Sequence, residues 1–304
     1  MSRAAAGWDV VVVGGGPAGL SAALWLARYR RRALVLDAGR PRNRVTWAVH
    51  GFPGLPDLPP DEIRARLREQ AMAAGAEFAS GTVRSVEGAQ DAFTVRTDEG
   101  AIQHARRVLL AFGLRDLLPE LPGLEEAFGQ SAFHCPDCDG PSVVGAPVAV
   151  YGRDREAAAL ALYLLTWASS VQLLTDGAPN ELRPEELDKL RANDIQLRTE
   201  RVRRIVAAGG RLERIELDAP PAVTAEALFF HLGARPACDI AEVLGCDREG
   251  GQLTVDHAQE TSIRGVFAAG DLAGPPYLAV SAAASGVRAA LAIHRSLLPA
   301  SRHL

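Results

Sequence analysis

A glycine-rich turn between an apolar run and a helical segment constrains the fold of this chain more than any other feature. Residues 8–13, WDVVVV, form an uninterrupted β-branched run, which predicts a buried parallel strand. Gly14, Gly16 and Gly19 follow at once in the spacing G-x-G-x-x-G, and residues 20–29 have helical spacing. The first glycine permits a tight turn, the second lets the backbone approach a pyrophosphate, and the third lets the helix pack on the strand. The free N–H groups of the helix N-terminus then face the phosphates.

A second strand completes this unit. Residues 33–36 are again apolar and end in Asp37, which lies where a ribose hydroxyl needs an acceptor. The apolar stretch 10–27 is long enough to suggest a membrane span, but the sequence Gly-Gly-Gly-Pro interrupts it. Strand, turn and helix explain the stretch better. We therefore expect a dinucleotide-binding βαβ unit and no membrane partner.

Charge and cysteine content exclude further classes of protein. The net charge of −4 and the pI near 6 give no indication of a nucleic-acid partner. Four cysteines in 304 residues do not make a disulfide scaffold, and the N-terminus has no signal-peptide pattern. We therefore expect a cytoplasmic protein in a reducing compartment.

Two of the cysteines lie within the sequence FHCPDCDG. Cys135 and Cys138 can close a small, reducible disulfide, and Asp139 can carry the proton that moves when the dithiol opens or forms. Alternatively, the pair is half of a zinc site, which needs a second pair of ligands. Cys238 and Cys246 are separated by seven residues and have no partner at metal-ligand spacing. We therefore expect no metal and two buried, inert cysteines.

Two neighbours of the thiols have open roles. Asp137 lies between the cysteines, and its charge should raise the thiol pKa unless a helix N-terminus dominates. His134 either tunes the thiolate or is an ordinary surface histidine.

A segment near the C-terminus carries a resemblance to a known family. Residues 261–271, TSIRGVFAAGD, resemble the second flavin motif of the two-dinucleotide-fold flavoproteins. In that family a short strand ends in Gly-Asp, and the aspartate, here Asp271, binds the ribityl chain of FAD. Residues 111–113, AFG, resemble the family's Ala-Thr-Gly strand end, and Val83 falls where the family contacts the adenine through the backbone. The implied cofactor is FAD.

Among these flavoproteins, Cys-x-x-Cys-Asp-Gly after the first flavin half resembles low-molecular-weight thioredoxin reductase. Residues 51–54, GFPG, are similar to a loop beside the flavin in that family. The sequences DAGRPRN and HGF resemble a divergent branch of thioredoxin-reductase-like proteins, which includes dithiol oxidases acting on small cyclic disulfides. By this resemblance Cys138 faces the flavin, Cys135 attacks a partner disulfide, and Asp139 handles the proton.

The resemblance also implies which residues bind FAD. They are Gly14, Gly16, Pro17, Ala18, Gly19, Asp37, Ala38, Arg42, Asn43, His50, Val83, Ala111, Gly113, Gly270, Asp271 and Ala279. One departure lies close to the last of them. The family places Arg-Gln-Ala near the isoalloxazine, whereas this chain has Tyr277-Leu278-Ala279. Tyr277 either covers flavin surface or packs in the core.

The implied architecture is α/β, with two Rossmann-like three-layer domains, the second inserted into the first. The FAD-binding domain comprises residues 1–116 and 242–304. The inserted NAD(P)-type domain, residues 117–241, carries the CxxC pair near its start.

The inserted domain departs from the family at its nucleotide site. A strand at 147–151 and a helix at 157–168 repeat the first unit, but Asp154 stands where the second glycine of the turn should be. Its side chain blocks backbone approach and its charge repels a pyrophosphate. No basic cluster for a 2′-phosphate follows the strand at 171–174. Asp176 could accept a ribose hydroxyl, which leaves weak NADH binding open, but NADPH is disfavoured as the donor.

We therefore expect an FAD-dependent thiol–disulfide oxidoreductase that does not use NADPH. Its electron donor would be ferredoxin or a reduced flavin, and a second flavin could stack in the vacated nicotinamide space. Its partner would be a thioredoxin-like protein or a small disulfide or dithiol, and the family implies a homodimer. Three alternatives stay open: a dithiol oxidase that uses oxygen, an ordinary NAD(P)H-dependent thioredoxin reductase, and a flavin-binding redox sensor without turnover.

Overall fold

The computed structural model describes residues 7–177 and 180–302, which form two compact units. Unit 1 comprises Met1–Arg44, Ala48–Arg115 and Ala234–Leu304, and unit 2 comprises Val45–Trp47 and Asp116–Gly233. The chain re-enters unit 1 eight residues before the expected position, 242. The reason is that β15 (Ala234–Pro236) pairs with β7 (Leu114–Asp116), and Ile240 and Ala241 are buried in the core of unit 1.

Unit 1 is built on a seven-stranded sheet with the order β3-β2-β1-β6-β5-β4, in which β18 also pairs with β6. The long strand β6 pairs with three strands. It lies parallel to β1 on one side, and on the other side its first half pairs antiparallel with β5 and its second half parallel with β18. The parallel part places the carboxyl ends of β1, β2, β6 and β18 at one edge, where ligands of doubly wound folds bind. The strands are β1 (Trp8–Val13), β2 (Ala33–Asp37), β3 (Glu77–Ser80), β4 (Val83–Glu87), β5 (Phe93–Thr97), β6 (Ile102–Leu110) and β18 (Val266–Ala268).

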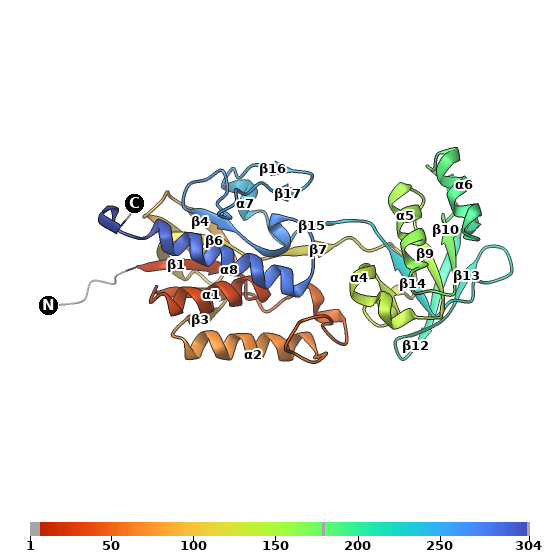
Figure 1. Ribbon diagram of the computed structural model, residues 1–304, viewed down its shortest axis with the longest axis horizontal. Coiled ribbons are helices and arrows are strands. Elements are labelled where there is room, and N and C mark those ends of the chain that lie inside the picture. The colour runs from red at the N-terminus through yellow and green to blue at the C-terminus, as the bar shows by residue number, and fades with distance from the viewer. Residues whose placement is uncertain (1–6, 178–179, 303–304) are drawn as a thin grey trace. The chain divides into compact units, whose positions relative to one another are not determined.

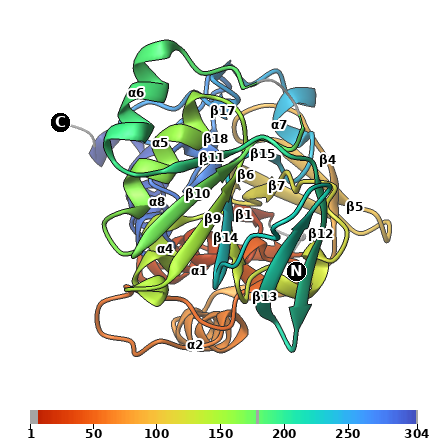
Figure 2. The same cartoon turned by 90° about the vertical axis from the view of Figure 1, so that its right-hand side faces the viewer.

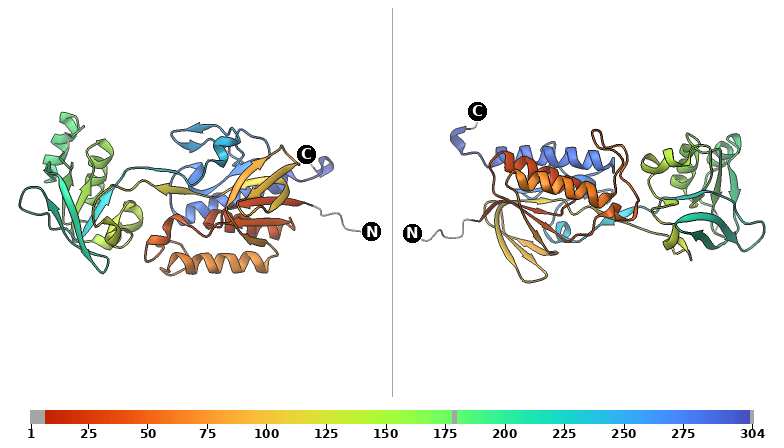
Figure 3. Two further views of the ribbon diagram at one scale, coloured as in Figure 1. Left: turned by 180° about the vertical axis from the view of Figure 1, so that it is seen from behind. Right: turned by 90° about the horizontal axis from the view of Figure 1, so that it is seen from below.

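Three helices cover one face of this sheet, α1 (Pro17–Arg28), α2 (Pro60–Ala73) and α8 (Ala279–Ser296) (Figures 1 and 3). Alanine and glycine let α1 and α8 approach closely, because a Cβ on Gly286 would collide with the backbone of Ala18. The opposite face packs against α7 (Ile240–Val243) and the small hairpin β16 (Arg248–Glu249) and β17 (Gln252–Leu253). Short 3-10 turns are η1 (Arg42–Val45), η3 (Gly270–Ala273) and η4 (Ala300–Arg302). No helix in the described ranges is long and apolar enough to cross a bilayer.

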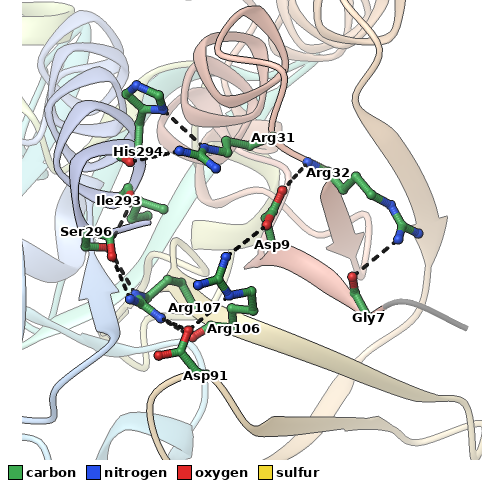
Figure 4. A network of polar contacts seen from close by, with 10 residues as sticks. All are labelled: Gly7, Asp9, Arg31, Arg32, Asp91, Arg106, Arg107, Ile293, His294 and Ser296. Carbon is green, nitrogen blue, oxygen red and sulfur yellow. Dashed lines mark hydrogen bonds and ion pairs between the residues drawn. The ribbon is translucent and has the colours of Figure 1, made fainter. Parts of the chain in front are cut away.

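A buried arginine ties the end of α8 to the sheet (Figure 4). Arg107, on β6, is 1% exposed. Its guanidinium donates to the Ser296 hydroxyl at 3.0 Å, to the Ser296 carbonyl at 2.8 Å and to the Asp91 carboxylate at 2.8 Å. The neighbouring Arg106 reaches the same Asp91 oxygen at 3.0 Å from a half-exposed position. Arg107 therefore joins three segments that are distant in the sequence.

Unit 2 has a five-stranded parallel sheet with the order β11-β10-β9-β14-β8. Helices α5 and α6 cover one face and the β12–β13 hairpin packs on the other (Figure 2). The strands are β8 (Ala132–Phe133), β9 (Pro147–Tyr151), β10 (Ser170–Leu174), β11 (Gln196–Arg198), β12 (Val202–Ala208), β13 (Arg211–Leu217) and β14 (Ala227–Phe230). The helices are α3 (Leu124–Ala127), α4 (Pro136–Asp139), η2 (Gly140–Val143), α5 (Arg155–Leu164) and α6 (Pro184–Ala192).

The predicted fold class and the strands at 8–13 and 147–151 are confirmed. The helix expected at 157–168 begins two residues earlier, where Asp154 caps it, and ends at Leu164. The apolar residues that follow form turns, with the amides of Trp167 and Ala168 bonded to the Leu164 carbonyl. The apolar sequence at 226–235 reads as a single strand, but the structure divides it into β14 and β15, with Gly233 at φ +79° between them.

Candidate active site

The glycine turn after β1 has the close packing that its spacing predicts. Gly14 has φ +110°, and a Cβ there would collide with the carbonyl of Ala111 at the end of β6. A Cβ on Gly19 would collide with the Gly14 carbonyl, so the start of α1 lies directly on the turn. Gly16, by contrast, has nothing within 4 Å of an added Cβ, and no side chain caps α1. The backbone at the start of α1 is therefore open to a phosphate group.

Asp37 ends β2 beside this turn, as predicted, and its carboxylate is held from two sides. One oxygen accepts from the Gly39 amide at 3.1 Å, and the other pairs with Arg64 of α2 at 2.7 Å. Arg64 also donates to the Gly15 carbonyl at 3.3 Å, and its side chain is 20% exposed. A cavity of about 350 Å³ lies here, lined by Gly15, Asp37, Gly39 and side chains of α2. The sequence analysis missed Arg64, since nothing in the pattern of α2 marks this arginine among its neighbours.

The second flavin motif meets the first at the start of α1. Gly270 has φ +75°, and a Cβ there would lie 3.0 Å from the Cβ of Ala18. Its amide donates to Ser285 of α8 at 3.1 Å, which fixes η3 on that helix. Asp271, on η3, pairs with Arg42 at 2.8 Å, so the structure brings together four of the predicted FAD residues from three distant segments, namely Ala18, Arg42, Gly270 and Asp271.

Tyr277 lies next to this ion pair. The Arg42 guanidinium is 5.3 Å from the centre of its ring, and the phenol oxygen accepts from Gln252 at 2.9 Å. Tyr277 is 37% exposed, so the interpretation that it packs in the core is wrong.

The other predicted FAD residues are more scattered. Val83 begins β4 and is buried, Gly113 has φ +69° after β6, and His50 pairs with Asp57 at 2.8 Å. Pro17 and Ala279 are the first residues of α1 and α8, Asn43 lies in η1, and Ala38 is exposed after β2. The uncapped turn at the start of α1, the Asp37 carboxylate and the Gly270-Asp271 turn together fit a dinucleotide such as FAD.

The cysteine pair forms a disulfide in unit 2 between Cys135 and Cys138. Cys135 is the N-cap of the one-turn helix α4, and its sulfur accepts from the Cys138 amide at 3.1 Å. Both cysteines are partly exposed, whereas Asp139 is 8% exposed. His134 lies 3.6 Å from Asp116 of β7. An accessible disulfide with a buried acid at the end of its helix suits thiol–disulfide exchange.

The remaining cysteines show no sign of chemistry. Cys246 is buried and Cys238 half-buried, both are free, and burial raises the pKa of each thiol. Among the described residues no three His, Cys, Asp or Glu side chains lie close enough together to hold a metal ion.

In unit 2 the turn between β9 and α5 corresponds to the glycine turn of unit 1, but the side chain of Asp154 occupies the start of the helix. The Asp154 carboxylate accepts from the Ala157 amide at 2.9 Å and so caps α5. Asp176, the candidate ribose acceptor, uses both oxygens: one accepts from the Tyr151 hydroxyl at 2.8 Å and the other from the Val202 amide at 2.7 Å. Burial and the bond to Asp176 raise the pKa of Tyr151 to about 12, so the phenol keeps its proton.

Comparison with known proteins agrees with this geometry. A family model described as pyridine nucleotide-disulphide oxidoreductase matches residues 8–286. Thioredoxin reductase of Aquifex aeolicus (strain VF5) is 32% identical over 301 residues, which cover 95% of this chain and 93% of that protein. The NADPH-dependent thioredoxin reductase 3 of Arabidopsis thaliana is 31% identical over 310 residues, covering 95% of this chain and 58% of that protein. The crystal structure of HlmI matches with a TM-score of 0.91 at 37% identity, covering 96% of this chain and 93% of that one. The chain therefore belongs to the pyridine nucleotide-disulphide oxidoreductase family and is a flavin-dependent disulfide oxidoreductase of the thioredoxin-reductase-like type.

Proposed function

We propose that this enzyme exchanges electrons between FAD and the Cys135–Cys138 disulfide, and then with a partner disulfide or dithiol, without a nicotinamide nucleotide. The observation that carries this proposal is the contrast between two turns at equivalent places in the two units. The start of α1 has no side-chain cap, whereas Asp154 occupies the start of α5. A bound pyrophosphate at α5 would have to displace this carboxylate and overcome its charge.

The ribose position of unit 2 is engaged within the protein, since the two oxygens of Asp176 accept from Tyr151 and from the backbone of β12. Asp37 of unit 1 is engaged on both oxygens too, by Gly39 and Arg64, but a cavity of about 350 Å³ lies beside it. The capping carboxylate of Asp154 is therefore the feature that makes NADPH and NADH poor ligands of unit 2.

The chemistry at the cysteines follows from thiol–disulfide exchange. FAD, when bound, supplies a two-electron carrier. Once the disulfide is reduced, the Cys135 thiolate attacks one sulfur of a partner disulfide, and the other partner sulfur leaves and takes a proton that Asp139 delivers. The Cys138 thiolate then attacks Cys135 in the mixed disulfide and releases the second partner thiol. The Cys135–Cys138 bond forms again, and the partner has gained two electrons.

Equilibrium titration with NADPH and NADH tests the nucleotide-independence directly. We expect no saturable binding below about 1 mM, that is, a standard binding free energy weaker than about −4 kcal/mol. The NADPH-dependent thioredoxin reductase 3 of Arabidopsis thaliana is the matched positive control. A micromolar dissociation constant for NADPH in the same assay would restore the ordinary reductase as the better description.

Arg64 gives a second prediction, on the cofactor site. Arg64→Met should weaken FAD binding by about tenfold, since it removes a charge-assisted hydrogen bond that orients Asp37. Arg66→Met is the control, because Arg66 lies on the same helix and its guanidinium pairs with the half-exposed Glu62 instead of Asp37. The fluorescence of FAD released on dilution measures how well each of the two variants retains the cofactor. Equal retention of FAD by the two variants would contradict a positioning role for Arg64.

A further inference from the structure

Tyr163 approaches the redox disulfide from a different element. It lies in the last turn of α5, and its hydroxyl donates to the Asp137 carboxylate at 2.7 Å. Asp137 is one of the two residues between the cysteines, and it lies on α4. The bond therefore links the helix of the nucleotide-type fold to the cysteine turn.

Packing supports the same link. The Tyr163 ring meets Trp167 edge-on at 5.4 Å between ring centres. The Trp167 ring in turn covers Gly140, where an added Cβ would lie 2.6 Å from the indole. Tyr163 is 47% exposed, so the fold does not require it as core. Its contacts are instead with Asp137 and Trp167, at the turn that carries the cysteines.

We propose that Tyr163 is a positioning residue for the redox disulfide: its hydroxyl holds the Asp137 carboxylate and offsets part of its charge, which keeps the Cys135 thiol reactive at neutral pH. The inference rests on the proposed function only in taking Cys135 as the attacking thiol. A carboxylate beside a thiol disfavours the thiolate, and a hydrogen bond donated to that carboxylate reduces the effect. The same bond raises the pKa of Tyr163, as expected for a donor to an anion.

Other titratable and charged groups also lie around the turn. Asp139 is buried on the same short helix, and His134 lies 3.6 Å from Asp116 of β7. The adjoining turn η2 has the sequence GPSV and carries no titratable side chain. On α5 the remaining charged residues, Arg155 and Glu156, are in its first turn, at the opposite end from Tyr163.

The test measures the pKa of Cys135 from the pH dependence of its alkylation in a Cys138→Ser background. Mass spectrometry of the peptide that contains Cys135 separates it from Cys238 and Cys246. Tyr163→Phe should raise this pKa by about one unit, which slows alkylation at pH 7 about tenfold. Asp137→Asn should lower it, and Tyr163→Phe should have no further effect in the Asp137→Asn background.

Tyr151→Phe is the matched control, since it removes another tyrosine–aspartate bond in unit 2, and Tyr151 packs against the core on the other face of the sheet. It should leave the pKa of Cys135 unchanged. An unchanged or lowered pKa in Tyr163→Phe overturns the proposal. So does a shift that persists in the Asp137→Asn background, because Tyr163 would then act without Asp137. The assay uses neither an electron donor nor turnover, so its outcome is independent of the nucleotide question.

Discussion

Replacing Cys138 with serine is expected to lower the rate of flavin reduction by a dithiol at least about a thousandfold, because the reacting sulfur is removed. In the proposed mechanism Cys138 is the thiol that reacts with the flavin, and Cys135, the N-cap of α4, is the thiol that attacks the partner. Stopped-flow absorbance of the flavin under anaerobic conditions measures the rate.

The serine variants of the two cysteines should lose different properties. Cys135→Ser should keep a long-wavelength thiolate–flavin band, because Cys138 is the flavin-reacting thiol in the proposed mechanism, and should lose exchange with partner disulfides. Cys138→Ser should lack the band. A Cys138→Ser variant reduced at the wild-type rate would instead favour a flavin-binding redox sensor, in which the disulfide has no part.

Replacing the buried Arg107 with methionine is expected to lower the free energy of unfolding by about 3 kcal/mol. The side chain is almost completely buried, and it bonds to Ser296 of α8 and to Asp91 (Figure 4). Its loss removes the donors of the Ser296 carbonyl and leaves a poorly filled site in the core. Urea unfolding of the FAD-free protein, followed by circular dichroism, gives the free energy.

Arg106→Met is the control for this prediction. Arg106 is the next residue, binds the same carboxylate of Asp91, and is 45% exposed. We expect it to cost less than about 1 kcal/mol, because exposed ion pairs contribute little. Burial would raise the pKa of Asp91, but the bonds and charges of Arg107 and Arg106 outweigh it and hold that pKa below its usual value. Equal losses in the two variants would show that burial does not decide the contribution of Arg107.

Local patterns sufficed to predict much of unit 1. The glycine turn and Asp37 follow from backbone and steric limits, whereas the Gly270-Asp271 turn was predicted from the family resemblance, and the structure brings all three to one edge of the sheet. The same logic identified Asp154 as the residue that alters the second turn, and its capping bond to Ala157 is the local consequence.

Long-range side-chain contacts could not be predicted in this way. Arg64 reaches Asp37 across 27 positions, and Tyr163 reaches Asp137 across 26. Both are polar residues in helices, where the spacing of apolar positions says nothing about which polar side chain finds a partner. The end of α5 was also missed, because the apolar residues after Leu164 continue the helical pattern while the backbone turns.

Anaerobic reduction of the purified holoenzyme tests the central claim most directly. Flavin absorbance is followed after mixing with NADPH, with NADH and then with a dithiol. We predict no bleaching within seconds by either nucleotide, followed by reduction and a long-wavelength thiolate–flavin band on addition of the dithiol. Admitting oxygen then separates the acceptors, since fast reoxidation favours a dithiol oxidase and slow reoxidation favours a protein or flavin partner. Rapid bleaching by NADPH would contradict the account and identify an ordinary thioredoxin reductase with an unusual turn.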